Sequence, residues 1–187
     1  MLYLTWVEGK FDEAEKQGHL ALKLEPLSSI DHADLSWTLY TASKFDEALT
    51  IAQTGIELDP NSFLSHRLAG LSYIGLNRNE EAIETFRNLA KISGRHQHSI
   101  TGLIWAYCNN KNFEEARKLM DELKTRSETE YIAPTYLGIA AAWLGDLDAA
   151  FDLLQKLMMI KTLISLSLNT RPMAPLHLEM IRVFKTC

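Results

Sequence analysis

Two histidines separated by one residue, His96 and His98, have a spacing that occurs in metal sites. A zinc site needs three or four ligands from side chains of this kind. The sequence around the pair offers no evident third ligand. We therefore expect two solvated histidines, and no metal ion bound between them.

Cys108, in the stretch YCNNK, is the cysteine that could serve as a nucleophile. No base is placed beside it in the sequence, and a free cysteine behaves as a small, often buried apolar residue. The chain also lacks a glycine-rich phosphate loop, a GxSxG motif and an HExxH motif. These observations predict no enzyme activity and no cofactor.

Pairs of carboxylates recur along the chain and could suggest acid–base catalysis. The pairs are Asp12-Glu13, Asp46-Glu47, Glu80-Glu81 and Glu114-Glu115. Each pair opens a segment with helical apolar spacing, where carboxylates interact favourably with the free N–H groups and the positive end of the helix dipole. Helix starts therefore explain these pairs without catalysis.

The acidic pairs belong to a repeat. Alanines recur at a constant separation of 34 residues, at Ala14, Ala48, Ala82, Ala116 and Ala150. Each unit reads as two helices, and proline closes the first two units at Pro26 and Pro60. Small side chains permit the closest helix contacts, and stacked units share a core that one helix pair cannot bury alone.

The repeat predicts an all-helical chain without strands. The expected helices lie near residues 31–42, 45–58, 63–76, 79–92, 97–109, 113–125, 133–144 and 147–160, with a short helix near 177–185.

This pattern resembles the tetratricopeptide repeat (TPR) family. The resemblance rests on the period, the alanines, the closing prolines, the glycines Gly70 and Gly138, and the aromatics Phe11, Phe45 and Phe113. Two features depart from the family. Its favoured tryptophan is replaced by His32, His66, Ile100 and Pro134, and its closing proline is replaced in later units by Gly94, Glu128 and Thr162.

The resemblance implies one TPR domain over residues 1–187, a right-handed α-α superhelix of about four and a half repeats with a C-terminal capping helix. The units are a partial one at 1–28 and full ones at 29–62, 63–96, 97–130 and 131–164. A tail and cap follow at 165–187.

A narrower resemblance concerns the end of the chain. The stretch from Ser127 to Leu157, followed by PMAPL, is similar to the C-terminal TPR modules of bacterial multidomain signalling proteins. Met1 falls at the seventh position of its unit, which leads us to expect the C-terminal part of a longer protein. The exposed stripe of residues 11–24 could then pair copies of the chain.

The family resemblance also implies a concave groove lined by the first helix of each unit. The corresponding residues are Trp6, Trp37, Tyr40, Arg67, Leu71, Ile74, His98, Trp105, Ile139 and Trp143. Two interpretations of the tryptophans stay open. They bind an apolar or helical protein segment, or they pack between neighbouring first helices or under a segment absent from this chain. Only Arg67 and Asn109 correspond to the carboxylate-clamp subtype, so we do not expect that subtype.

Composition limits the partners. The chain has 187 residues and a net charge of −5, without the basic footprint that nucleic-acid binding needs. Two cysteines favour a reducing, cytoplasmic location, and the longest apolar run is too short to span a membrane. We expect a non-catalytic protein-interaction module; the alternative is a self-assembly module, such as a homodimer, that uses its open ends or groove.

Overall fold

The computed structural model describes residues 9–153 and 155 of the chain. Those residues form helices and turns without any β-strand, as the repeat predicts. The helices are α2 (Phe11–Leu24), α3 (Ser29–Thr41), α4 (Phe45–Leu58), α5 (Phe63–Gly75), α6 (Asn79–Ile92), α7 (Gln97–Asn109), α8 (Phe113–Arg126) and α9 (Pro134–Trp143). Residues 147–153 are helical as well.

The observed helix ends agree closely with the predicted ones. The bounds of α4, α6 and α7 are those expected from the repeat. The largest difference is at α3, which begins two residues earlier than expected. It does so because the Ser28 hydroxyl accepts a hydrogen bond from the backbone N–H of Asp31, at 3.2 Å, and caps the helix there. The helix expected near 177–185 lies outside the described residues.

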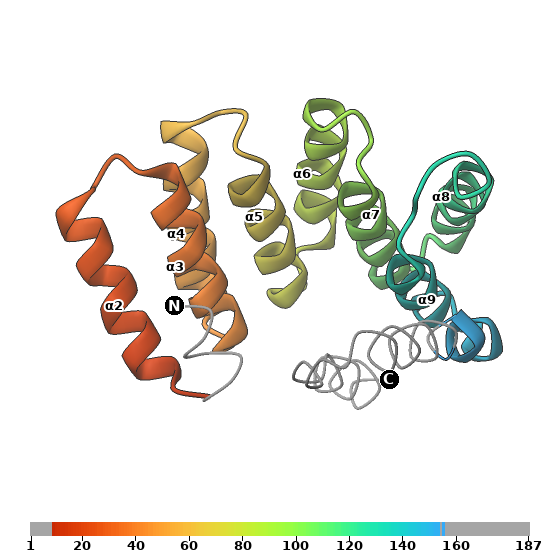
Figure 1. The fold of residues 1–187 in the computed structure, drawn as a ribbon, viewed down its shortest axis with the longest axis horizontal. Coiled ribbons are helices and arrows are strands. Elements are labelled where there is room, and N and C mark those ends of the chain that lie inside the picture. The colour runs from red at the N-terminus through yellow and green to blue at the C-terminus, as the bar shows by residue number, and fades with distance from the viewer. Residues whose placement is uncertain (1–8, 154, 156–187) are drawn as a thin grey trace, which may run out of the picture.

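The helices follow one another from α2 to α9 in an arched row (Figure 1). Each helix packs against the next, and the first helices α3, α5, α7 and α9 also pack against one another. Within the described part of the chain, the second helices α2, α4, α6 and α8 make no such contact with each other. In a curved array, helices on the inner side lie closer together than helices on the outer side. The first helices, which touch one another, therefore form the concave layer, and the second helices form the convex layer.

A left-handed backbone residue lies two residues before the second helix of each unit. These residues are Gly9, Ser43, Asn77, Lys111 and Gly145, with φ between 58° and 83°. The N–H of the following residue reaches back to close the first helix, as in Lys44 N to Leu39 O at 2.9 Å. This is the hydrogen bond of a Schellman motif. The same backbone turn therefore follows each of α3, α5, α7 and α9.

The five repeated alanines are all fully buried. A close contact joins two neighbouring units. The ring of Phe86 on α6 is fully buried between Gly70 of α5 and Gly102 of α7. A Cβ at Gly70 would lie 2.7 Å from Phe86 Cε2, and one at Gly102 would lie closer still to the ring. The two glycines thus make the space that the phenylalanine fills.

Candidate functional site

The concave layer carries most of the predicted groove residues in the described part of the chain. Seven of them are half-buried: Trp37, Tyr40, Arg67, His98, Trp105, Ile139 and Trp143. Trp6 lies outside the described residues. We call the surface formed by the seven the concave face.

The first cluster on the concave face joins α3 to α5. The Arg67 guanidinium lies 5.1 Å from the ring centre of Trp37, within the range of a cation–π interaction. Tyr40 stands one helical turn further along α3, with its ring centre 6.1 Å from that of Trp37. The concave face therefore presents the indole ring of Trp37 and the positive charge of Arg67 side by side.

The second cluster joins α5, α7 and α9 around His98. Its imidazole stacks on His96 at 5.2 Å, and its Nε2 shares a hydrogen bond of 2.7 Å with the Tyr136 hydroxyl. The ring of Phe63 stands edge-on to both histidines, at 5.5 Å from His96 and 6.0 Å from His98. These contacts correct the expectation of two solvated histidines, because His98 is half-buried and engaged on several sides.

The surroundings of His98 disfavour its protonated form. Burial, together with the positive charge of Arg67, lowers the pKa of His98 to about 4. The imidazole is therefore neutral near pH 7, and Arg67 remains as the charge at this part of the concave face.

The third cluster is a stack of two indoles. The rings of Trp105 on α7 and Trp143 on α9 lie 4.8 Å apart, with 9° between their planes. Both residues are half-buried and pack partly against the core. These tryptophans therefore pack between neighbouring first helices and also remain partly at the surface.

Leu71 and Ile74 differ from the sequence expectation. They are 8% and 4% exposed and belong to the buried core cluster. Both lie in the C-terminal half of α5, and this helix packs against α3 on one side and α7 on the other. The half-buried groove residues therefore form separate clusters, and Leu71 and Ile74 lie beneath the surface between them.

Phe63, His96 and Tyr136 belong to the clusters but were missed by the sequence reasoning. They occupy the first, last and sixth positions of their units, and none of the residues that the family resemblance assigned to the groove stands at these positions. The available signal was that an aromatic or histidine side chain stands near the start of three consecutive first helices.

Charge is sparse on this layer. The first helices α3, α5, α7 and α9 contain Asp31, Asp34 and Arg67 as their Asp, Glu, Lys or Arg residues. Burial raises the pKa of the Asp34 carboxyl above its usual value. The described first helices are thus largely uncharged, with two carboxylates on α3 and one guanidinium on the neighbouring α5.

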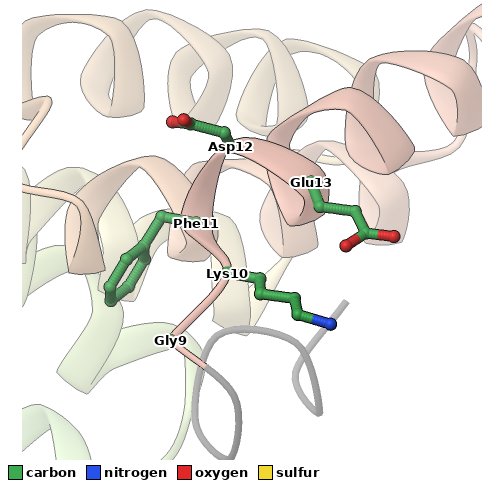
Figure 2. A pocket seen from close by; sticks show the side chains of 5 residues that line it. All are labelled: Gly9, Lys10, Phe11, Asp12 and Glu13. Carbon is green, nitrogen blue, oxygen red and sulfur yellow. The ribbon is translucent and has the colours of Figure 1, made fainter.

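Catalytic chemistry finds little support in the described residues. Burial raises the pKa of the Cys108 thiol to about 11, which keeps it protonated and unreactive. No three His, Cys, Asp or Glu side chains lie together there in a manner suited to a metal ion. The shallow depression at the start of α2 is lined by consecutive residues, Gly9 to Glu13, whose side chains point in different directions (Figure 2).

The described helices are short relative to the thickness of a bilayer. None of the helices among the described residues has the length and apolar character to cross one.

Comparison with known proteins agrees with the repeat. A family model described as PPR repeat matches residues 99–127, which cover most of α7 and α8. No curated protein matches the sequence. A similar solved structure is a thermophilic TPR protein of Thermus thermophilus, with a TM-score of 0.67, 18% identity, and coverage of 81% of this chain and 83% of that chain.

Two further solved structures resemble the array. MamA 41-end from Desulfovibrio magneticus RS-1 has a TM-score of 0.59 at 16% identity, over 84% of this chain and 89% of that chain. Naa15/Naa10 bound to HypK-THB has a TM-score of 0.54 at 20% identity, over 90% of this chain and 25% of that chain. These likenesses establish the fold: the chain is a helical solenoid of the tetratricopeptide type.

Proposed function

We propose that this chain is a non-catalytic protein-interaction module whose concave face binds a protein segment with apolar side chains on one side of a helix. The observation that carries the proposal is the row of three aromatic clusters on neighbouring first helices. Each cluster holds its rings by contacts from a neighbouring first helix, as Trp143 on α9 holds Trp105 on α7 at 4.8 Å. Side chains held in this way lose little conformational entropy when a partner binds.

The composition of the concave face fits an apolar partner. Tryptophan, tyrosine and arginine are the residues that most often dominate binding energy at protein interfaces. The face supplies Trp37, Tyr40 and Arg67 at one end and the Trp105–Trp143 stack at the other. A partner segment would match the concave face if its apolar side chains contacted the aromatic residues at both ends of the face and a carboxylate lay near Arg67.

RNA is the other class of partner to weigh, because some helical repeats of the PPR type read one base per unit. RNA binding relies on positive charge along the phosphate backbone. This chain has a net charge of −5, and Arg67 is the one Lys or Arg on the described first helices. These charges favour a protein partner.

The biological setting rests on the sequence resemblance at the end of the chain. Its similarity to TPR modules of bacterial signalling proteins supports a regulatory or scaffolding role within a larger bacterial signalling protein in the cytoplasm. The structure of MamA and that of Naa15/Naa10 bound to HypK-THB show arrays of similar shape.

The test is a selection from a phage-displayed library of amphipathic helical peptides, with single-stranded RNA oligonucleotides as the competing class of ligand. We expect peptides with apolar side chains at spacings of three and four residues. Trp37→Ala and Trp105→Ala should each weaken binding about tenfold or more, equivalent to about 1.4 kcal/mol. Circular dichroism melting of each variant must show that the array stays folded.

Phe113→Ala is the matched control, because Phe113 is an exposed aromatic side chain at the start of the convex helix α8. It should leave peptide binding unchanged. Binding of RNA but of no peptide would refute the proposal. So would folded Trp37→Ala and Trp105→Ala variants that still bind every selected peptide.

A further inference from the structure

Two indoles of the concave face stand in one row across the array. Trp37 on α3 and Trp105 on α7 occupy the same position of the repeat, two units apart. Leu71 and Ile139 occupy that position on α5 and α9. Both tryptophans are half-buried, whereas Leu71 is buried. The row therefore presents two large rings at the surface, separated by a buried leucine on the helix between them.

The packing of the first helices sets the separation of the two indoles. α5 lies between α3 and α7 and packs against both (Figure 1). Because the axes of packed helices lie about 8–10 Å apart, equivalent positions on α3 and α7 are separated by roughly 16–20 Å. A partner that contacts both indoles must span this distance across α5.

A helical partner spans that distance with a defined number of residues. An α-helix rises about 1.5 Å and turns about 100° for each residue, so a span of roughly 16–20 Å takes about eleven to thirteen residues. Residues eleven apart lie on the same side of the helix, about 20° from one another. Residues twelve or thirteen apart point in clearly different directions, by about 120° and 140°. Eleven is therefore the spacing that lets one helix contact both indoles.

Charge distinguishes the two ends of the row. Asp31, Asp34 and Arg67 are the Asp, Glu, Lys or Arg residues of the described first helices, and all three lie on α3 or α5. The Arg67 guanidinium lies 5.1 Å from the ring centre of Trp37. A carboxylate of the partner is therefore favoured close to the residue that contacts Trp37, and an uncharged side chain is favoured at Trp105.

We propose that the partner of the concave face is a single α-helix that lies across α3, α5 and α7, with apolar residues eleven apart on Trp37 and Trp105. A carboxylate four residues from the Trp37 contact, on the same side of the partner helix, pairs with Arg67. This inference rests on the proposed function, because it specifies which helical segment the same face binds.

Isothermal titration calorimetry with synthetic helical peptides tests the spacing. Each peptide carries two leucines on an alanine-based helix, seven, nine or eleven residues apart, and a glutamate four residues from one leucine. Each is made in both sequence directions. At pH 7 the eleven-residue spacing should bind at least about tenfold more tightly than the others. The nine-residue spacing is the matched control, because it has the same composition but places the leucines on opposite sides of the helix.

A double-mutant cycle tests which indole each leucine contacts. Trp105→Ala should weaken binding of the eleven-residue peptide about tenfold. It should have little further effect once alanine replaces the leucine distant from the glutamate, because the two changes remove the same contact. Arg67→Gln should abolish the preference for glutamate over glutamine in the peptide. Phe113→Ala on the convex helix α8 should leave every affinity unchanged.

The outcomes separate this inference from the proposed function. Equal affinities for all three spacings, with Trp37→Ala and Trp105→Ala each weakening binding, would overturn the inference and leave the proposed function intact. So would tighter binding of a proline-containing extended peptide with leucines six residues apart, which spans about 20 Å as a strand. If the wild-type chain binds none of these peptides and none from the displayed library, the proposed function fails and the inference falls with it.

Discussion

The Tyr136 hydroxyl and the His98 Nε2 atom share a hydrogen bond of 2.7 Å that ties α9 to α7 at the N-terminal ends of both helices. The ring centres of the two residues lie 4.5 Å apart, edge to face. Arg67 from α5 and His96 from the turn before α7 face the same imidazole. Burial and the positive charge of Arg67 keep the imidazole neutral near pH 7 in this contact.

Acidification should weaken the array through His98. Its pKa is lowered to about 4 in the folded chain, while an unfolded histidine titrates near pH 6.5. Below about pH 6.5 the unfolded chain binds a proton that the folded chain refuses, so stability falls as the pH drops toward 4. Urea unfolding at pH 7.5 and pH 5.0 should show a loss of about 1–2 kcal/mol from this group.

Carboxylates also titrate in this range, so the comparison needs a matched variant. His98→Gln keeps a hydrogen-bonding side chain but cannot be protonated, and its stability should change less between the two pH values. Equal losses in both proteins would show that His98 does not couple folding to pH.

Gly102→Ala should destabilise the array. The added Cβ would overlap the Phe86 ring, which is fully buried between two helices and has no space to withdraw. Overpacking of this kind costs about 1–3 kcal/mol. Thermal melting followed by circular dichroism should show a lower midpoint, whereas Asn88→Ala on the exposed side of α6 should leave it nearly unchanged. An unaltered midpoint in Gly102→Ala would mean that α7 can shift away from α6 freely.

Lys111→Gly should stabilise the array. Lys111 has φ of 59°, in the left-handed region that side chains with a Cβ disfavour. Glycine removes that strain but adds freedom to the unfolded chain, so the expected net gain is about 0.5–1 kcal/mol. Asn77→Gly serves as the comparison, because asparagine tolerates this conformation and should gain less. Urea midpoints would decide, and a loss of stability in Lys111→Gly would show that its side chain makes a compensating contact.

Glu122→Gln should have a small effect that depends on salt. Glu122 accepts hydrogen bonds from Arg95, and Arg126 lies 3.5 Å away. The Arg95 pair lowers the pKa of the Glu122 carboxyl, but these side chains are partly exposed, and such pairs contribute about 0–1 kcal/mol. The difference between wild type and variant should shrink in 1 M NaCl. A large, salt-independent loss would indicate that Glu122 holds the turn by geometry instead of charge.

Much of the fold was predictable because one signal is repeated. A single alanine at a helix contact is weak evidence, but Ala14 and its four equivalents share one period, and each is fully buried. The turn residues repeat with the same spacing, so Ser43 and Lys111 take the conformation that glycine takes at Gly9 and Gly145. Periodicity thus fixes helix ends that local preferences leave vague.

The concave face was predictable only in part. Family positions indicate which side of a helix faces inward, but they carry no information on how closely neighbouring helices approach. That approach buries Leu71 and Ile74 and brings Trp105 onto Trp143. The His98 cluster depends on side chains from three helices, whose rotamers no single-helix pattern specifies.

The contact between Phe86 and Gly102 has a consequence for how this array could be rearranged. At the equivalent positions one unit earlier, the sizes are reversed: Ala52 takes the place of Phe86, and Leu68 takes the place of Gly102. Both are buried in the same cluster. If the units were shuffled, Phe86 would collide with a leucine, or Ala52 would leave a hole beside a glycine. The turns of the units are alike, but the volumes of the buried side chains fit each unit only to its own neighbours. Recombination between repeats of this gene would therefore yield misfolded chains more often than the regular period suggests.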